Sequence, residues 1–287
     1  MSETDLIEIK GISPERLKEI EQQIAEKWES ISICNDFVFC KIMQDEELLA
    51  ELIRRILPDL MFKKLDIQAQ KTVEIGPDIH GVRFDVFVEL EDGSVVEIEM
   101  QVLDTGNLPK RLRFYGSMAD TQMLEKGILY SNLKDSYVIM ICPFDEYKKG
   151  RHIYTFTNKC TEEPELEMGD GTTKIVLNAI GTQDDVSEKL KAFLDYVAGK
   201  TVDDEYVKKL DEAVHKARAN KKWRKEYMTL MMRDLENREL GREEERKELI
   251  ADMLRRGKEP QAIADFCDYP IKLIMEVKNG LASLSVK

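Results

Sequence analysis

Hydrophobic residues change their spacing several times along the chain, and these changes separate helical from strand-like segments. An apolar residue every third or fourth position predicts a helix, whereas alternation with period two predicts a strand. Helical spacing occurs at 14–28, 35–57, 108–126 and 186–197, and strand-like runs occur at 65–75, 82–90, 95–103, 137–142, 152–157 and 174–178. The run 137–142 is almost wholly apolar, as expected of a central strand buried on both faces. The chain is therefore of the α/β class.

The two ends of the chain differ from this middle part. Ser13, Pro14 and Glu15 form a helix start, with a cap, a proline in the first turn and an early acid. Beyond Gly199 no strand pattern is present, and strong helix formers in highly charged sequence predict helices. We therefore expect an N-terminal helical extension at 1–34, an α/β domain at 35–200 and a helical C-terminal region at 201–287.

Composition limits the possible classes of protein. The chain has 287 residues and a formal net charge of −13, so any nucleic-acid binding must be local, because the whole chain repels polyanions at long range. No apolar stretch approaches the roughly 20 residues that span a bilayer, and the N-terminus is acidic. The five cysteines are odd in number and widely spaced, which is typical of free thiols. We expect a cytoplasmic protein.

Several common chemistries lack their motifs. The phosphate-binding patterns G-x-x-x-x-G-K-[ST] and G-x-G-x-x-G are absent, as is the hydrolase pattern G-x-S-x-G. His80, His152 and His215 are far apart and have no metal-ligand spacing with cysteine, so we expect them to be structural.

The informative segment is GVRFDVFVELEDGSVVEIEMQVL, at 81–103, which predicts a β-hairpin. Each strand has one apolar face, and pairing must set apolar positions opposite each other. A two-residue turn would set Val86 opposite Glu99 and mix the faces. An odd-length loop, with Gly93 in the left-handed conformation, sets Asp85 opposite Glu99 instead. We therefore predict an odd-length loop and two adjacent carboxylates.

Adjacent carboxylates repel each other unless a proton or a cation compensates them. Mg²⁺ takes one or two carboxylates and keeps other positions for water or phosphate oxygens. Glu89 and Glu97 lie on the same face of the hairpin, and on periodicity alone a half-exposed sheet with acids facing water is the commoner explanation of this pattern. Spacing alone leaves both interpretations open.

Asp85 and the run EIEMQ, with Glu99 and Gln101, resemble the PD-(D/E)XK nuclease core in the variant where Gln replaces Lys. The segments NDFVFCKIM, LPKRLRFYGSMADTQMLEKGILYSNLKDSYVIMICPFD, GRHIYTF and GTTKIVLNAIG resemble, in order, the Rpn family of recombination-promoting nucleases, also described as PD-(D/E)XK nuclease family transposases. The resemblance covers roughly 35–200. It implies a restriction-endonuclease-like core, with a mixed central sheet flanked by helices, and metal-dependent DNA cleavage.

The resemblance also implies roles for individual residues. Asp85 and Glu99 would hold Mg²⁺ and Gln101 would orient water or phosphate, so these three are the expected catalytic residues. Gln101 has no charge to offer a phosphate, and Arg111 or Arg113 on the following helix could supply one. The alternative is that these arginines pair with an acid such as Asp104. We expect Tyr115 to serve in packing.

Asp36, at the start of the helix that flanks this site, has two possible roles. It is either a third carboxylate ligand or the helix cap, and capping is the commoner use of an aspartate there.

The C-terminal region leaves its role open. KARANKKWRK, at 216–225, could bind phosphates or pair with flanking acids. The short helices from Leu249 onward suit a helix-turn-helix or a small packing bundle, the latter compatible with a homodimer. Three hypotheses follow for the whole chain. They are a Mg²⁺-dependent DNA endonuclease, a binding module that keeps the nuclease fold, and a recombination or transposition accessory that acts with a partner.

Overall fold

The chain forms two compact units in a computed structural model that describes residues 12–73, 82–123 and 129–284. The larger unit is Ser30–Lys221, and the other combines the chain up to Glu29 with Lys222 onward. Helix α6 (Glu205–Ala219) packs against α2, α3 and α5. The larger unit therefore extends past residue 200, where the change of composition placed a boundary.

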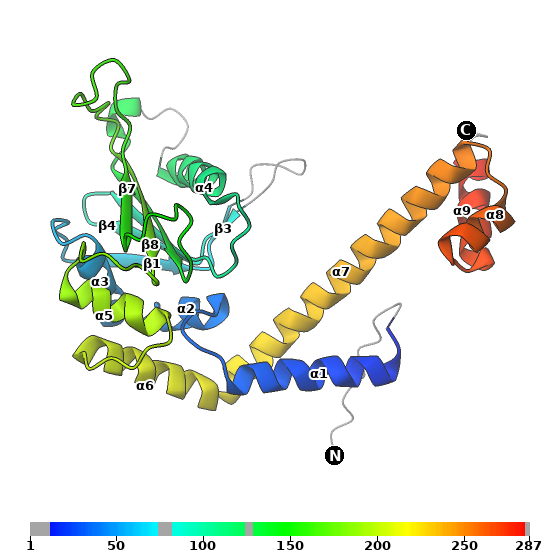
Figure 1. Ribbon diagram of the computed structural model, residues 1–287, viewed down its shortest axis with the longest axis horizontal. Helices are drawn as coiled ribbons and strands as arrows, with labels where there is room; N and C mark the ends of the chain where they lie inside the picture. The colour runs from blue at the N-terminus through cyan, green and yellow to red at the C-terminus, as the bar shows by residue number, and fades with distance from the viewer. Residues whose placement is uncertain (1–11, 74–81, 124–128, 285–287) are drawn as a thin grey trace. The chain divides into compact units, whose positions relative to one another are not determined.

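A six-stranded mixed sheet with strand order β1-β4-β5-β6-β8-β7 forms the centre of the larger unit (Figure 1). The central strands β5, β6 and β8 run parallel, whereas β1, β4 and β7 pair antiparallel with their neighbours. A parallel pair needs a crossover, and α4 supplies the one between β5 and β6. The strands of this sheet are β1 (Leu65–Ala69), β4 (Val86–Leu90), β5 (Val95–Met100), β6 (Ser136–Cys142), β7 (Ile153–Phe156) and β8 (Thr172–Asn178). A separate two-stranded sheet consists of β2 (Thr72–Val73) and β3 (Val82–Arg83).

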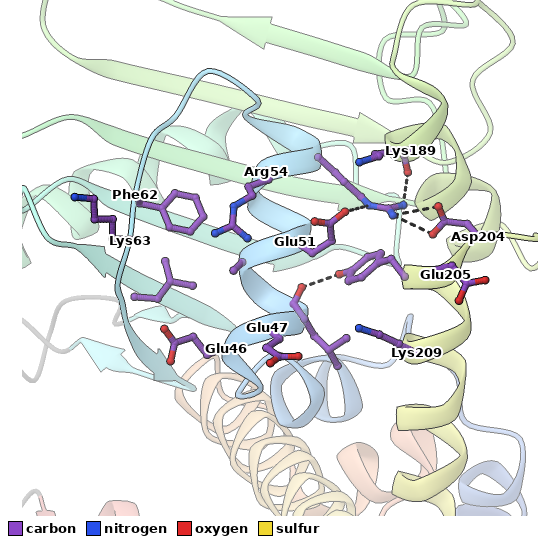
Figure 2. A pocket seen from close by; sticks show the side chains of 15 residues that line it. Glu46, Glu47, Glu51, Arg54, Phe62, Lys63, Lys189, Asp204, Glu205 and Lys209 are labelled. Carbon is purple, nitrogen blue, oxygen red and sulfur yellow. Dashed lines mark hydrogen bonds and ion pairs between the residues drawn. The ribbon is translucent and has the colours of Figure 1, made fainter.

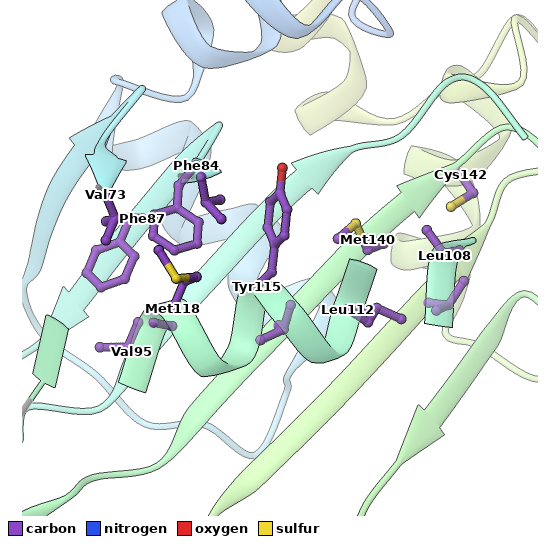
Figure 3. Packing of buried hydrophobic residues seen from close by; sticks show 14 of the residues in the cluster. Val73, Phe84, Phe87, Val95, Leu108, Leu112, Tyr115, Met118, Met140 and Cys142 are labelled. Carbon is purple, nitrogen blue, oxygen red and sulfur yellow. The ribbon is translucent and has the colours of Figure 1, made fainter. Parts of the chain in front are cut away.

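Helices cover both faces of this sheet. Helix α4 packs on β6 and β8, while α2 contacts β5 and α3 contacts β1 (Figure 1). Beneath α4, the side chains of Leu112, Tyr115 and Met118 pack on residues of the sheet such as Phe87 and Met140 (Figure 3). The helices of this unit are α2 (Asp36–Ile42), α3 (Glu46–Ile56), α4 (Leu108–Met123), the 3₁₀ turn η1 (Tyr130–Asn132), α5 (Glu188–Val197) and α6.

Three segments that the sequence predicts as continuous are divided. The helix expected at 35–57 is two helices, because the Asp45 carboxylate accepts hydrogen bonds from the N–H groups of Glu47 and Leu48 and caps α3. The strand expected at 65–75 breaks at Gln70, whose φ is 56°, and its last two positions lie outside the described residues. The strand expected at 82–90 breaks between β3 and β4.

A buried arginine joins three helices of the larger unit. Arg55 of α3 donates hydrogen bonds to Glu51, to the carbonyl of Lys189 and to Asp204, and its guanidinium lies 4.5 Å from the Tyr206 ring centre (Figure 2). A cavity of about 800 Å³ opens beside it. The cavity lining includes no proposed catalytic residue, so we regard Arg55 as structural.

The second unit is helical in its described residues. Trp28 of α1 packs on Tyr227 of α7, and Ile250, Ile263 and Ile274 form a small core where α7, α8 and α9 meet. A helix-turn-helix and a small packing bundle would both contain such a core, so both alternatives stay open. The helices are α1 (Pro14–Glu29), α7 (Lys221–Arg255), α8 (Pro260–Cys267) and α9 (Ile271–Leu284). No helix in the described parts of the chain is long and apolar enough to cross a membrane.

Candidate active site

The β4–β5 hairpin has the predicted register. Val86 lies opposite Ile98 and Phe87 opposite Glu97, so the same register sets Asp85 opposite Glu99. The Leu90 N–H donates to the Ser94 carbonyl and leaves 91–93 as a three-residue loop, with Gly93 at φ 85°. The expectation of an odd-length loop and adjacent carboxylates is confirmed.

The two strands separate at the acidic pair. Instead of bonding main chain to main chain, the Asp85 N–H donates to Glu99 Oε1 at 2.6 Å and the Met100 N–H donates to Asp85 Oδ2 at 3.0 Å. Upstream, the Phe84 N–H bonds to Lys71 and the chain turns into β3. This exchange of side-chain for backbone bonds explains the break between β3 and β4, and it fixes both carboxylates.

Both carboxylates are buried, and burial makes their ionised forms unfavourable. Burial raises the pKa of Asp85 to about 6, although the Met100 N–H opposes this rise. The pKa of Glu99 lies well above its usual range, first because of burial and then because Asp85 and Glu97 are nearby. The pair therefore has a shortage of positive charge that a cation would relieve.

Glu97 is a third buried acid, which the sequence does not single out. Its side chain is 0% exposed and neither carboxylate oxygen has a hydrogen-bond partner among the described residues. Burial, followed by the charge of Asp85, raises its pKa well above the usual range. The alternation of β5 could have revealed it, since Glu97 and Glu99 share a face, and that face is covered by α4 rather than by water.

Arg111 of α4 reaches the acidic pair and Gln101. Its guanidinium donates to Gln101 Oε1 at 2.6 Å and to the Tyr115 hydroxyl at 2.9 Å, and it lies 3.8 Å from Glu99 Oε2. The Gln101 amide in turn donates to the Leu103 carbonyl. Arg111 therefore does pair with an acid, as the alternative expected, but among the described residues that acid is Glu99 and not Asp104. Tyr115 packs as expected, with its ring against Phe84 (Figure 3), and its hydroxyl also accepts the hydrogen bond from Arg111.

Arg113 does not join this group. The buried residues of α4 include Leu112 and Tyr115, whereas Arg113 lies between them on the exposed surface of the helix. Of the two candidate arginines, the structure therefore brings only Arg111 to the carboxylates.

Helix α2 contributes two side chains near Asp85. Asn35, not Asp36, is the helix cap, because its side chain accepts from the Val38 N–H, so the capping role expected for Asp36 is wrong. Asp36 is the first residue of the helix, lies 4.0 Å from Arg83 and raises the pKa of Asp85 through its charge, after burial. Cys40, one turn further on, hydrogen-bonds to Asp85, and burial raises its own pKa.

Comparison with known families agrees with this geometry. A family model described as PD-(D/E)XK nuclease family transposase matches residues 33–255. The chain belongs to this family. No curated protein and no solved structure matches the chain.

The acids of this PD-(D/E)XK chain fit a divalent cation. Asp85 and Glu99 present two carboxylates on one face, and Glu97 adds a third buried carboxyl group whose oxygens have no hydrogen-bond partner in the described part of the chain. Among the described residues, no group of three or more His, Cys, Asp and Glu side chains is arranged as a complete metal site. A two-carboxylate site suits Mg²⁺, which binds few protein ligands and retains water.

Other candidates of this PD-(D/E)XK chain have structural contacts. The His152 ring lies 3.1 Å from Asp185 and that of His215 lies 3.4 Å from Asp211, while His80 lies outside the described residues. In the basic run at 216–225, the Lys216 ammonium lies 4.0 Å from Glu212, whereas Arg218 donates to the Ile31 carbonyl. Arg224 forms an ion pair with Glu29 at 3.4 Å.

Proposed function

We propose that the protein is a Mg²⁺-dependent DNA endonuclease of the Rpn type that hydrolyses phosphodiester bonds during DNA recombination or transposition. The observation that carries this proposal is the buried pair Asp85 and Glu99, whose carboxylates accept hydrogen bonds from the Met100 N–H and the Asp85 N–H respectively. Family membership supports the nuclease chemistry. The free state of the described cysteines is consistent with action in the cytoplasm.

Asp85 and Glu99 would hold the cation, with the Met100 carbonyl as a further oxygen ligand and Asp36 near enough to add charge. When bound, Mg²⁺ lowers the pKa of water and stabilises charge on phosphate. Gln101 would position the attacking water through its amide. Arg111 would bind a phosphate oxygen, because its guanidinium lies at the exposed side of the pair with 37% of its side chain accessible.

The test is a Mg²⁺ titration of the parent and of Glu99→Gln, with cation binding measured by calorimetry and nicking of supercoiled plasmid measured in the same samples. Glu89→Gln is the matched control, because Glu89 is an exposed acid on the same hairpin. We expect Glu99→Gln to lose cation affinity and cleavage by at least about 100-fold while the control keeps both. Equal cleavage by Glu99→Gln and the parent would refute the site.

A second candidate is a nuclease-fold binding module. Gln101 is neutral, and both ends of its amide already bond to the protein, which favours a weak or inactive catalyst. DNA retention without Mg²⁺-dependent nicking would support this alternative. Nicking that appears only with an added protein would support an accessory that acts within an assembly.

A further inference from the structure

Two apolar side chains lie exposed directly beyond the proposed catalytic strand. Val102 is 44% exposed and Leu103 is 71% exposed, and they follow Gln101 in sequence. We call Val102 and Leu103 the apolar lip. Single exposed hydrophobic residues are ordinary, whereas two in succession beside a candidate active site form a surface that a ligand can contact.

The apolar lip belongs to a hydrogen-bonded loop. The Gln101 amide donates to the Leu103 carbonyl, and the Gly106 N–H donates to the Asp104 carboxylate at 3.0 Å. Thr105 Oγ1 bonds to Asn107 at 2.6 Å. These bonds stabilise the loop in the conformation that exposes Leu103. They also attach the lip to the side chain that we propose positions water.

Cationic and aromatic side chains stand close to the lip in sequence, on the solvent side of α4. Lys110, Arg113 and Phe114 are exposed, and their three- and four-residue spacing places them on one side of the helix. Cations contact phosphates, whereas aromatic side chains stack on bases and apolar side chains insert between base steps. A chain of net charge −13 gains little from phosphate contacts alone, so contacts with bases must supply part of its affinity for DNA.

We propose that the apolar lip enters the base stack of the substrate, so that the enzyme acts on DNA whose bases are unstacked or unpaired at the cleaved position. This inference rests on the proposed function and names its substrate class. Unstacking a base step costs a few kcal/mol, and an inserted apolar side chain offsets that cost. A bulge or mismatch removes most of the cost, and such DNA should be cut fastest.

The test compares a matched duplex with the same duplex carrying a two-nucleotide bulge. The parent should cut the bulged DNA at least about 10-fold faster. Leu103→Ala should slow cleavage of the matched duplex by about 5- to 100-fold, because no inserted side chain then offsets the cost of unstacking, and slow cleavage of the bulged duplex much less. Val102→Ala is a second variant, and Met61→Ala, exposed to 88%, is the matched control.

A binding measurement separates this inference from the proposed function. The probe is 2-aminopurine, placed at the cleaved position of the matched duplex, and no divalent cation is added. The fluorescence of the 2-aminopurine should rise when the parent or Met61→Ala binds this DNA, but not when Leu103→Ala binds it. A parent that cuts no DNA would refute the nuclease proposal, whereas the fluorescence would still show whether the apolar lip unstacks a base on binding. No rise with the parent, or an equal rise with Leu103→Ala, would overturn the inference, and an apolar protein partner would then be the better occupant.

Discussion

The ionised form of Asp85 should destabilise the folded protein, and Asp85→Asn should remove that cost. Burial raises the pKa of Asp85 from 3.8 to about 6. Because the folded state holds this proton more tightly than the unfolded chain does, the parent loses stability as the pH rises from about 4 through 6. At 1.36 kcal/mol for each pH unit between the two pKa values, the full cost is about 3 kcal/mol.

Urea unfolding of the parent and Asp85→Asn without divalent cations measures this cost. The amide oxygen of Asn can still accept the Met100 N–H, so the two proteins should be equally stable near pH 4. At about pH 8 the variant should be more stable by about 3 kcal/mol, or roughly 6–12 °C in melting temperature. Asp59→Asn, at an exposed position, should change neither value.

One outcome of the Asp85→Asn measurement would refute the reasoning about burial. If Asp85→Asn is no more stable than the parent at about pH 8, ionised Asp85 is compensated within the folded chain and the reasoning about burial is wrong. Adding Mg²⁺ should narrow the gap, because a cation that binds only the folded parent stabilises it in proportion to the logarithm of its concentration.

Two further substitutions test the buried charges. Arg55→Ala should lower the free energy of unfolding by roughly 3–5 kcal/mol, because it leaves Asp204 without its buried partner, whereas Arg54→Ala, on the surface, should cost less than about 1 kcal/mol. Urea unfolding measures both, and equal losses would show that Arg55 is not a structural centre. Glu97→Leu should raise the free energy of unfolding by about 1–3 kcal/mol at neutral pH, because it removes from the core an acid without a hydrogen-bond partner among the described residues. A lower free energy of unfolding would mean that the Glu97 carboxyl group has a stabilising partner.

The hairpin register could be predicted from sequence because each strand has one apolar face. A slip by one residue would have placed Val86 opposite Glu99, so the alternation alone selected the pairing of Asp85 with Glu99. The mixed sheet and its flanking helices agree with what the resemblance implies, and most of the individual strands and helices could be predicted from their periodicity. Each strand and helix carries its own periodic signal, independent of its partners.

The features missed from sequence depend on contacts between distant residues or on competing local bonds. Glu97 reads as a solvated acid until α4 covers it, and the strand break at Asp85 arises from hydrogen bonds to Glu99 and Met100. The division of the helix at Asp45 is local, but its cap competes with continuous helical spacing. Period-based reasoning favours the longer element in such cases.

The buried acids Glu97 and Glu99 of β5, together with Asp85, lower the stability of the fold, so a requirement for stability alone would not retain them. Burial raises the pKa values of three carboxyl groups, those of Asp85, Glu97 and Glu99, and the guanidinium of Arg111 forms an ion pair with Glu99 at 3.8 Å. An apolar strand in the same position would give a more stable fold, because burying an unpaired charge costs more free energy than packing an apolar side chain. The excess of negative charge therefore favours a cationic ligand over a structural role, and it predicts that the variants gaining most stability at this face lose cation binding.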